Sequence, residues 1–99
     1  MSGKFYITAN GYNSYELLDA DASFIFKIAK IVTEKFHFTH ANPAVGIEQA
    51  FMDFVKDGIR ITLGWDTWSG CFVMAHDHLG NKYIEEIGNY LDEHPILDK

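Results

Sequence analysis

The chain has little cysteine, few basic residues and no long apolar run, and each shortage excludes a class of protein. A single cysteine, Cys71, rules out an intramolecular disulfide framework and fits a reducing compartment. Lys and Arg number 8 against 14 Asp and Glu, so the net charge is −6 and a nucleic-acid-binding surface is not expected. No apolar stretch suits a signal peptide or a membrane span. We therefore expect a cytoplasmic protein that binds neither membranes nor nucleic acid directly.

What is present suffices for one small folded domain. The 99 residues are 47% hydrophobic and 15% aromatic, which is too apolar for a disordered chain. No repeat or linker interrupts them, so residues 1–99 are expected to form a single domain. Residues 1–45 are electrically neutral, and the whole excess of acid follows residue 45. Such asymmetry favours a basic partner, although a surface that only keeps a protein soluble shows it too.

The period of the apolar residues predicts two helices and four strands. Residues 5–9 are rich in strand formers and stop at the turn signal Asn10-Gly11. Apolar residues recur at helical spacing over 22–36 and over 81–93. Between these helices the chain predicts three further strands joined by hairpins.

The two helices determine the expected architecture. Each has an apolar stripe that needs a sheet face to cover. We therefore expect an α+β, two-layer fold of order β-α-β-β-β-α, with an antiparallel-rich sheet of about four strands and both helices on one face. Residues 10–20 and 37–48 are expected to form loops.

The dipeptide Asp57-Gly58 gives the sharpest local prediction, because it favours a type I′ hairpin between two strand-like runs. The turn length fixes the register. On one face the opposed pairs are apolar: Phe54 with Ile61, Met52 with Leu63, and Ala50 with Trp65. On the other face Phe51 is expected to cover Gly64, a pairing that stabilises a bare glycine in a sheet.

A second hairpin is expected through Ser69-Gly70. A two-residue turn there places Phe72 and Met74 on the apolar face, whereas a three-residue turn would reverse their parity. With the two-residue turn, the uncovered face carries these residues: Phe51, Asp53, Val55, Arg60, Thr62, Asp66, Trp68, Cys71, Val73 and Asp77.

Aromatic side chains among carboxylates on an uncovered sheet are typical of a surface that recognises another protein. The residues expected to contact a partner are Asp53, Asp66, Trp68 and Asp77, together with Glu85 and Glu86 of the second helix. The open alternative is that the two predicted loops cover this face.

The segment His76-Asp77-His78 places two imidazoles two residues apart, a spacing compatible with binding a transition metal. A zinc site needs three or four ligands, and His37 and His40 could complete it only if folding brings them close. We therefore expect no metal site. A small metal-binding protein or enzyme that uses His76 and His78 remains the second hypothesis.

Catalytic motifs are missing from the sequence. Cys71 has no flanking signature of a catalytic cysteine, and the glycines form no phosphate-binding loop. We expect no catalytic residue and no cofactor, and hence not an enzyme. A third hypothesis is a homo-oligomeric structural module that pairs through its open sheet face.

The acidity, the Asp57-Gly58 hairpin and the run from Gly64 to Gly70 leading into residues 71–75 resemble small immunity proteins of bacterial toxin systems, especially contact-dependent growth inhibition. The resemblance covers about residues 50–93. It implies a cytoplasmic, non-catalytic protein that binds a cognate toxin domain, often a basic nuclease, and occludes its active site with acidic side chains. No site residue is carried over, because these proteins share no universal motif.

Overall fold

The computed structural model describes residues 3–9, 11–18, 20–45, 50–68 and 70–94, with only the backbone of residues 41–45 and 50. Within these ranges the elements follow in the order β1 (Lys4–Ile7), β2 (Asn13–Leu17), α1 (Phe24–Glu34), β3 (Thr39–Val45), β4 (Ala50–Lys56), β5 (Ile59–Asp66), β6 (Gly70–Ala75) and α2 (His78–Glu93).

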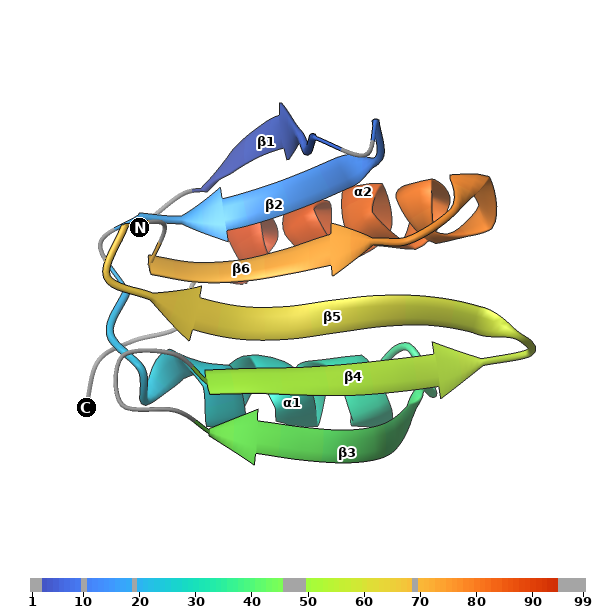
Figure 1. The fold of residues 1–99 in the computed structure, drawn as a ribbon, viewed down its shortest axis with the longest axis horizontal. Helices are drawn as coiled ribbons and strands as arrows, with labels where there is room; N and C mark the ends of the chain where they lie inside the picture. Colours follow the sequence, from blue (N-terminus) through green and yellow to red (C-terminus); the bar gives the residue numbers. More distant parts are fainter. Residues whose placement is uncertain (1–2, 10, 19, 46–49, 69, 95–99) are drawn as a thin grey trace.

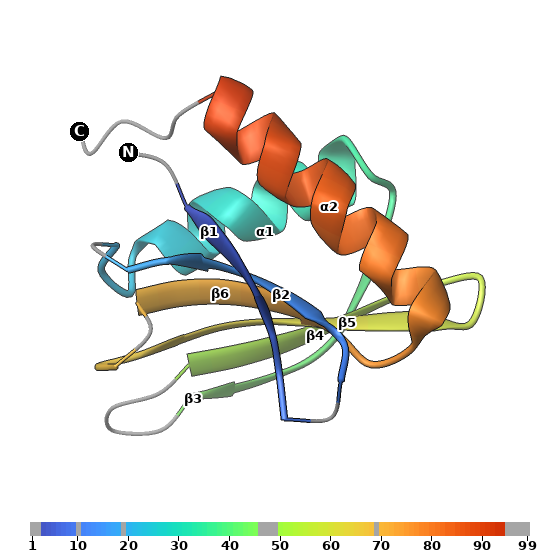
Figure 2. The same ribbon diagram turned by 90° about the horizontal axis from the view of Figure 1, so that it is seen from above.

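One antiparallel sheet holds all the described strands in the order β1-β2-β6-β5-β4-β3 (Figure 1). Both helices lie on the same face of it (Figure 2). The expected α+β fold with an antiparallel sheet and two helices is confirmed. The sheet has six strands rather than about four. Neither helix in the described ranges is long and apolar enough to cross a membrane.

The two additional strands, β2 and β3, lie in the segments that were expected to be loops. β2 returns from β1 through a turn at Gly11, whose φ is 90°, so the turn signal there opens a hairpin instead of a long loop. β3 contains Pro43, which cannot donate a main-chain hydrogen bond. Proline is tolerated here because β3 is an edge strand, and its pairing with β4 shifts register between His40 and Pro43.

The first predicted hairpin is confirmed. Asp57 and Gly58 both have positive φ, of 50° and 80°, as a type I′ turn requires. The paired residues of β4 and β5 run from Lys56 with Ile59 back along both strands, in the register that the turn length predicts.

The second hairpin differs from the prediction by one residue. Asp66 pairs with Gly70, so residues 67–69 form a three-residue connection and not a two-residue turn through Ser69-Gly70. Ser69 itself lies outside the described residues.

That one residue reverses the two faces of β6. Cys71 and Val73 point toward the helices and are each 1% exposed, while Phe72 and Met74 lie on the opposite face, where Phe72 is 8% exposed and Met74 is half-buried. The prediction was therefore wrong for all four side chains.

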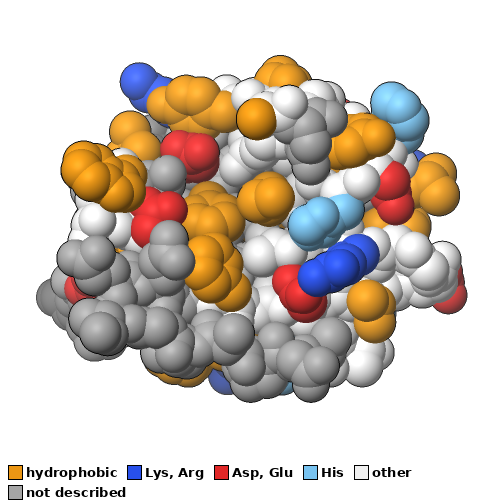
Figure 3. All heavy atoms as spheres, viewed as in Figure 1, with side chains coloured by type: hydrophobic (Ala, Val, Ile, Leu, Met, Phe, Trp, Pro, Cys, Tyr) orange, Lys and Arg blue, Asp and Glu red, His pale blue; other side chains and the backbone are white. Residues whose placement is uncertain are grey.

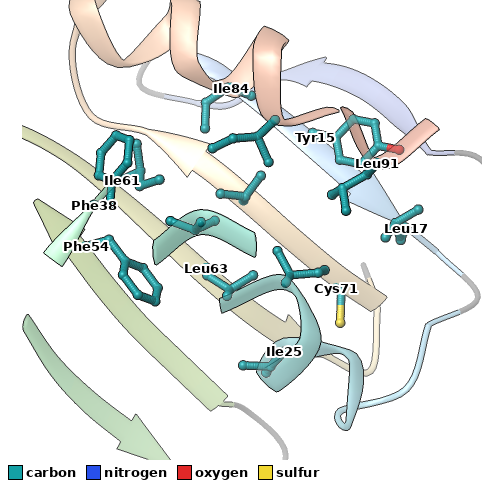
Figure 4. Packing of buried hydrophobic residues seen from close by; sticks show 14 of the residues in the cluster. Tyr15, Leu17, Ile25, Phe38, Phe54, Ile61, Leu63, Cys71, Ile84 and Leu91 are labelled. Carbon is teal, nitrogen blue, oxygen red and sulfur yellow. The ribbon is translucent and has the colours of Figure 1, made fainter. Parts of the chain in front are cut away.

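The apolar stripes of both helices meet the sheet in one core (Figure 4). α1 contributes buried residues at helical spacing, namely Phe24, Ile25, Ile28 and Val32. α2 does the same with Ile84, Ile87 and Leu91. Because both stripes are used on one side, the packing of this core leaves the other sheet face without a helix.

Gly70, the first residue of β6, is the tightest point of the second hairpin. Its φ is 71°, and a Cβ there would lie 2.2 Å from the carbonyl oxygen of Leu17. Gly58 has a similar φ of 80°, but no atom lies within 4 Å of the Cβ position. A side chain at Gly58 would therefore cause backbone strain alone, whereas a side chain at Gly70 would cause backbone strain and a steric clash.

We expect Gly70→Ala to lower the free energy of unfolding by roughly 3 kcal/mol, because backbone strain and a clash with Leu17 act together. Gly58→Ala should lower it by about 1–2 kcal/mol, from backbone strain alone. Urea denaturation of both variants measures the difference. Equal losses would contradict the close approach of Gly70 to β2.

Candidate functional site

The candidate binding surface is the sheet face opposite the helices, which Figure 3 views directly. No helix of the described chain crosses it, and apolar, acidic, basic and histidine side chains are mixed on it (Figures 1 and 3). Strand alternation and register place these residues on the face: Glu16, Phe51, Asp53, Arg60, Thr62, Asp66, Phe72 and Met74.

An aromatic pair occupies the middle of one row of this face. Gly64 of β5 lies between Phe51 of β4 and Phe72 of β6, which are its cross-strand partners. The two rings meet across the glycine with centroids 6.0 Å apart and an interplanar angle of 62°. The predicted pairing of Phe51 with Gly64 is confirmed, and the reversed parity of β6 adds Phe72 to it.

Two carboxylates flank the aromatic pair. Glu16 is the cross-strand partner of Phe72, and Asp66 lies two residues beyond Gly64 on β5. Partial burial raises the pKa of Glu16, and the negative charge of Asp66 raises it further. No described residue forms an ion pair with Glu16. The ionised Glu16 therefore destabilises the folded state above its ordinary pKa, because the folded form binds its proton more tightly.

Trp68 lies in the connection just after the end of β5. Its backbone N–H donates to Oδ1 of Asp66 at 2.9 Å, which ties the connection to the carboxylate. Its side chain is 90% exposed. By contrast, Trp65 points to the helices and its Nε1 donates to the carbonyl of Ala20 at 3.0 Å. We call Glu16, Phe51, Asp66, Trp68 and Phe72 the acidic–aromatic patch.

A polar network occupies the neighbouring part of the face. The Thr62 hydroxyl donates to Asp53 Oδ1 at 2.7 Å, and His76 Nε2 lies 2.7 Å from the same hydroxyl oxygen. Because the hydroxyl hydrogen goes to the carboxylate, the geometry assigns the Nε2–H tautomer to His76. Arg60 forms an ion pair with Asp53.

This network neutralises Asp53 from within the chain. Burial alone would raise the pKa of Asp53, but the hydrogen bonds from Thr62 and Arg60 and the charge of Arg60 outweigh it and hold the pKa below its ordinary value. Asp53 therefore lies on the expected face and is ion-paired with Arg60. Glu16 has Lys4 as its cross-strand neighbour on β1 but forms no ion pair with it.

The remaining acids of the predicted contact set lie elsewhere. Asp77 was expected on the open face, but it is the N-cap of α2, where its Oδ1 accepts a hydrogen bond from the Gly80 N–H at 2.7 Å. Glu85 and Glu86 are exposed on α2, in the layer on the far side of the sheet (Figure 2). Only Asp53, Asp66 and Trp68 of the predicted set lie on the open face or at its end.

The two histidines of the proposed metal pair diverge. His76 turns to Thr62 on the open face, whereas His78 begins α2 and meets the edge of the Tyr12 ring at a centroid distance of 5.4 Å. The His40 ring packs on Phe54, 5.3 Å between centroids. In the part of the chain that the structure describes, no three His, Cys, Asp or Glu side chains group to hold a metal ion.

The expected place of Cys71 on the open face is also wrong. Its Sγ is buried against α1 and donates to the carbonyl of Asp21 at 3.4 Å. Burial, and to a lesser extent the charge of Asp21, raises the pKa of Cys71 to about 12. The thiol is therefore protonated at neutral pH, in which state it is a poor nucleophile.

The sequence interpretation missed Glu16, Phe72 and His76 on the open face. Phe72 and His76 depend on the parity of β6, which the length of the connection before it decides. The position of Glu16 could have been predicted from the sequence, because the apolar residues Tyr15 and Leu17 flank it in the alternating pattern of a strand. In the structure both of these neighbours are buried. Comparison of the chain with protein-family models, curated proteins and solved structures gave no match.

We expect Thr62→Val to lower the free energy of unfolding at neutral pH by about 1–2 kcal/mol, because Asp53 loses a hydrogen bond in a nearly isosteric change. The low pKa of Asp53 stabilises the fold above its unfolded pKa, and this is lost as the pH falls through the folded pKa. The difference from wild type should therefore shrink as the pH falls below the ordinary pKa of an aspartate and through the folded pKa of Asp53.

Thr33→Val is the matched control, since the Thr33 hydroxyl donates only to the carbonyls of Ala29 and Lys30. Urea denaturation at neutral and acid pH measures both variants. A Thr62→Val effect that stays constant with pH, as expected for Thr33→Val, would contradict the link to Asp53.

Proposed function

We propose that the protein is a non-catalytic acidic binding protein that recognises a basic protein partner through the acidic–aromatic patch. The observation that carries the proposal is an aromatic pair beside two mutually repelling carboxylates, on a sheet face that no helix of the described chain covers. One of these carboxylates, Glu16, forms no ion pair with any described residue.

A cationic side chain from a partner would change the energetics of this patch. It would lower the pKa of Glu16 and convert a repulsion between Glu16 and Asp66 into an attraction. An arginine suits the position best, because its planar guanidinium stacks on aromatic rings and binds carboxylates through two hydrogen bonds. Trp68, exposed at the end of the patch, has the residue type that most often anchors an interface.

The net charge indicates the class of partner. A protein of charge −6 associates rapidly with a basic surface by electrostatic steering. The resemblance to immunity proteins adds a specific role, in which the patch occludes the active site of a cognate toxin, often a basic nuclease, in the cytoplasm. Unlike the metal-binding hypothesis, this role does not need His76 and His78 on one side of the molecule.

We expect Glu16→Gln to raise the free energy of unfolding at neutral pH and to slow association with the partner. Both follow from removing a charge that is unfavourable in the free protein and favourable in the complex. The probe is the product of the reading frame next to the gene, with association measured by stopped-flow fluorescence over a series of NaCl concentrations.

Glu86→Gln is the control for this test, since Glu86 is exposed on α2 in the opposite layer. It should change neither stability nor the association rate. If Glu86→Gln slows association and Glu16→Gln does not, the acidic helix is the binding surface and the patch is not. An association rate that ignores salt would contradict the electrostatic part of the proposal.

We expect Trp68→Ala to weaken binding of the same partner by about 30-fold, the effect of about 2 kcal/mol that is typical of an anchor residue. Stability should be unchanged, because Trp68 is 90% exposed. The matched control is Phe26→Ala, another exposed aromatic, on α1 at the far layer. Isothermal titration calorimetry compares the two, and equal effects would show that Trp68 is not an anchor.

A further inference from the structure

β1 is an edge strand whose outer side has no neighbour among the described strands (Figure 1). All four of its residues, Lys4–Ile7, are exposed, and three of them are large and apolar or aromatic. Edge strands of monomeric proteins are usually protected by prolines, bulges, several charges or a covering segment. β1 carries only one charge, on Lys4, and neither a proline nor a register shift.

The hydrogen-bond pattern shows which main-chain groups face outward. The Thr8 N–H donates to the carbonyl of Tyr12 at 2.9 Å. Hydrogen-bonded pairs alternate in an antiparallel ladder, so the next such pair is Tyr6 with Ser14. The N–H and C=O groups of Phe5 and Ile7 therefore point away from β2, to the outer edge of the sheet.

The outward N–H and C=O groups of one β1 strand can pair with the same groups of a second β1 strand. Two copies related by a twofold axis at Tyr6 place Phe5 of one copy opposite Ile7 of the other. Each such pair exchanges an N–H···O=C bond in both directions, so the two pairs make four main-chain hydrogen bonds and join the sheets into one. A second copy of the chain therefore supplies a strand that matches this edge.

Shape also favours a second copy at this edge, and charge does not oppose it. β1 carries Lys4 and no acid, so no two acids of the paired strands would face each other. A cavity of about 350 Å³ beside β1 is lined by Phe5, Tyr6, Ile7, Asn13, Glu85 and Asn89. Phe5 points to the cavity side, where it packs on Tyr15, so Ile7 of the second copy would lie at the cavity mouth.

We propose that the protein forms a symmetric dimer through antiparallel pairing of its β1 edges, leaving the acidic–aromatic patch uncovered. The dimer does not depend on the proposed function. A pair of four-residue strands buries less than the roughly 1,600 Å² of a standard interface, so the dimer is weak and concentration-dependent.

Sedimentation equilibrium over a concentration series up to about 1 mM tests this proposal, since weak dimers have dissociation constants up to that range. The wild-type mass should rise from 11.3 kDa toward twice that value. Ile7→Lys should hold the mass at the monomer value, because it places a charge at the paired edge. Phe26→Lys is the matched control: Phe26 and Ile7 are 66% and 67% exposed, but Phe26 lies on α1 and its variant should dimerise normally.

Amide hydrogen exchange of the wild-type protein is a second test of the dimer, and it needs no variant. The amides of Phe5 and Ile7 should become protected as the concentration rises, while the Tyr6 amide, bonded to Ser14, is protected throughout. A monomer at every concentration would overturn the proposal. So would a dimer that survives Ile7→Lys but is lost in Met74→Lys, because the open sheet face would then be the interface.

Discussion

The length of the connection between β5 and β6 is the constraint on which the rest of the molecule depends. Three residues separate Asp66 from Gly70, and this odd number decides that Cys71, Val73 and Ala75 complete the core beneath the helices. Only glycine fits at position 70, because the chain there has positive φ and lies against the Leu17 carbonyl. Gly70 therefore brings the second hairpin into close contact with the end of β2.

The same parity creates the open face. With Phe72 turned outward, the gap over Gly64 is closed by an aromatic pair, and Glu16 is brought beside it by the pairing of β2 with β6. The two halves of the face then differ in how their charges are compensated. Asp53, Thr62, Arg60 and His76 satisfy one another, whereas the acidic–aromatic patch keeps a partly buried carboxylate next to a second negative charge. Retaining an unfavourable charge is characteristic of binding sites, where stability and function conflict.

The sequence predicted those parts of the fold that local chemistry determines. Asp57-Gly58 specifies both the turn type and the register, and the apolar period specifies both helices, although α2 begins three residues early because Asp77 caps it. What it did not predict depends on distant contacts. β3 carries Pro43 and pairs only because β4 offers an edge, and the parity of β6 depends on a loop length that composition does not encode. The placement of Cys71, Val73 and Asp77 was wrong for that reason. Asp53 and Asp66 do lie on the open face, and Trp68 follows the end of β5.

The count of charges along the sequence gave the correct net charge, but it did not identify Glu16 as the carboxylate that lies in the acidic–aromatic patch. The excess of acid follows residue 45, yet Asp53 there is paired with Arg60 and Asp77 caps a helix, so neither is available to a partner in the way the count suggests. Glu16 belongs to the neutral half and becomes significant only because the sheet places it near Asp66. The neutral half also supplies β1, an edge strand that carries no acid. Folding therefore divides the surface into an acidic–aromatic patch suited to a basic partner and an edge suited to the chain itself, and these surfaces lie at different parts of one sheet.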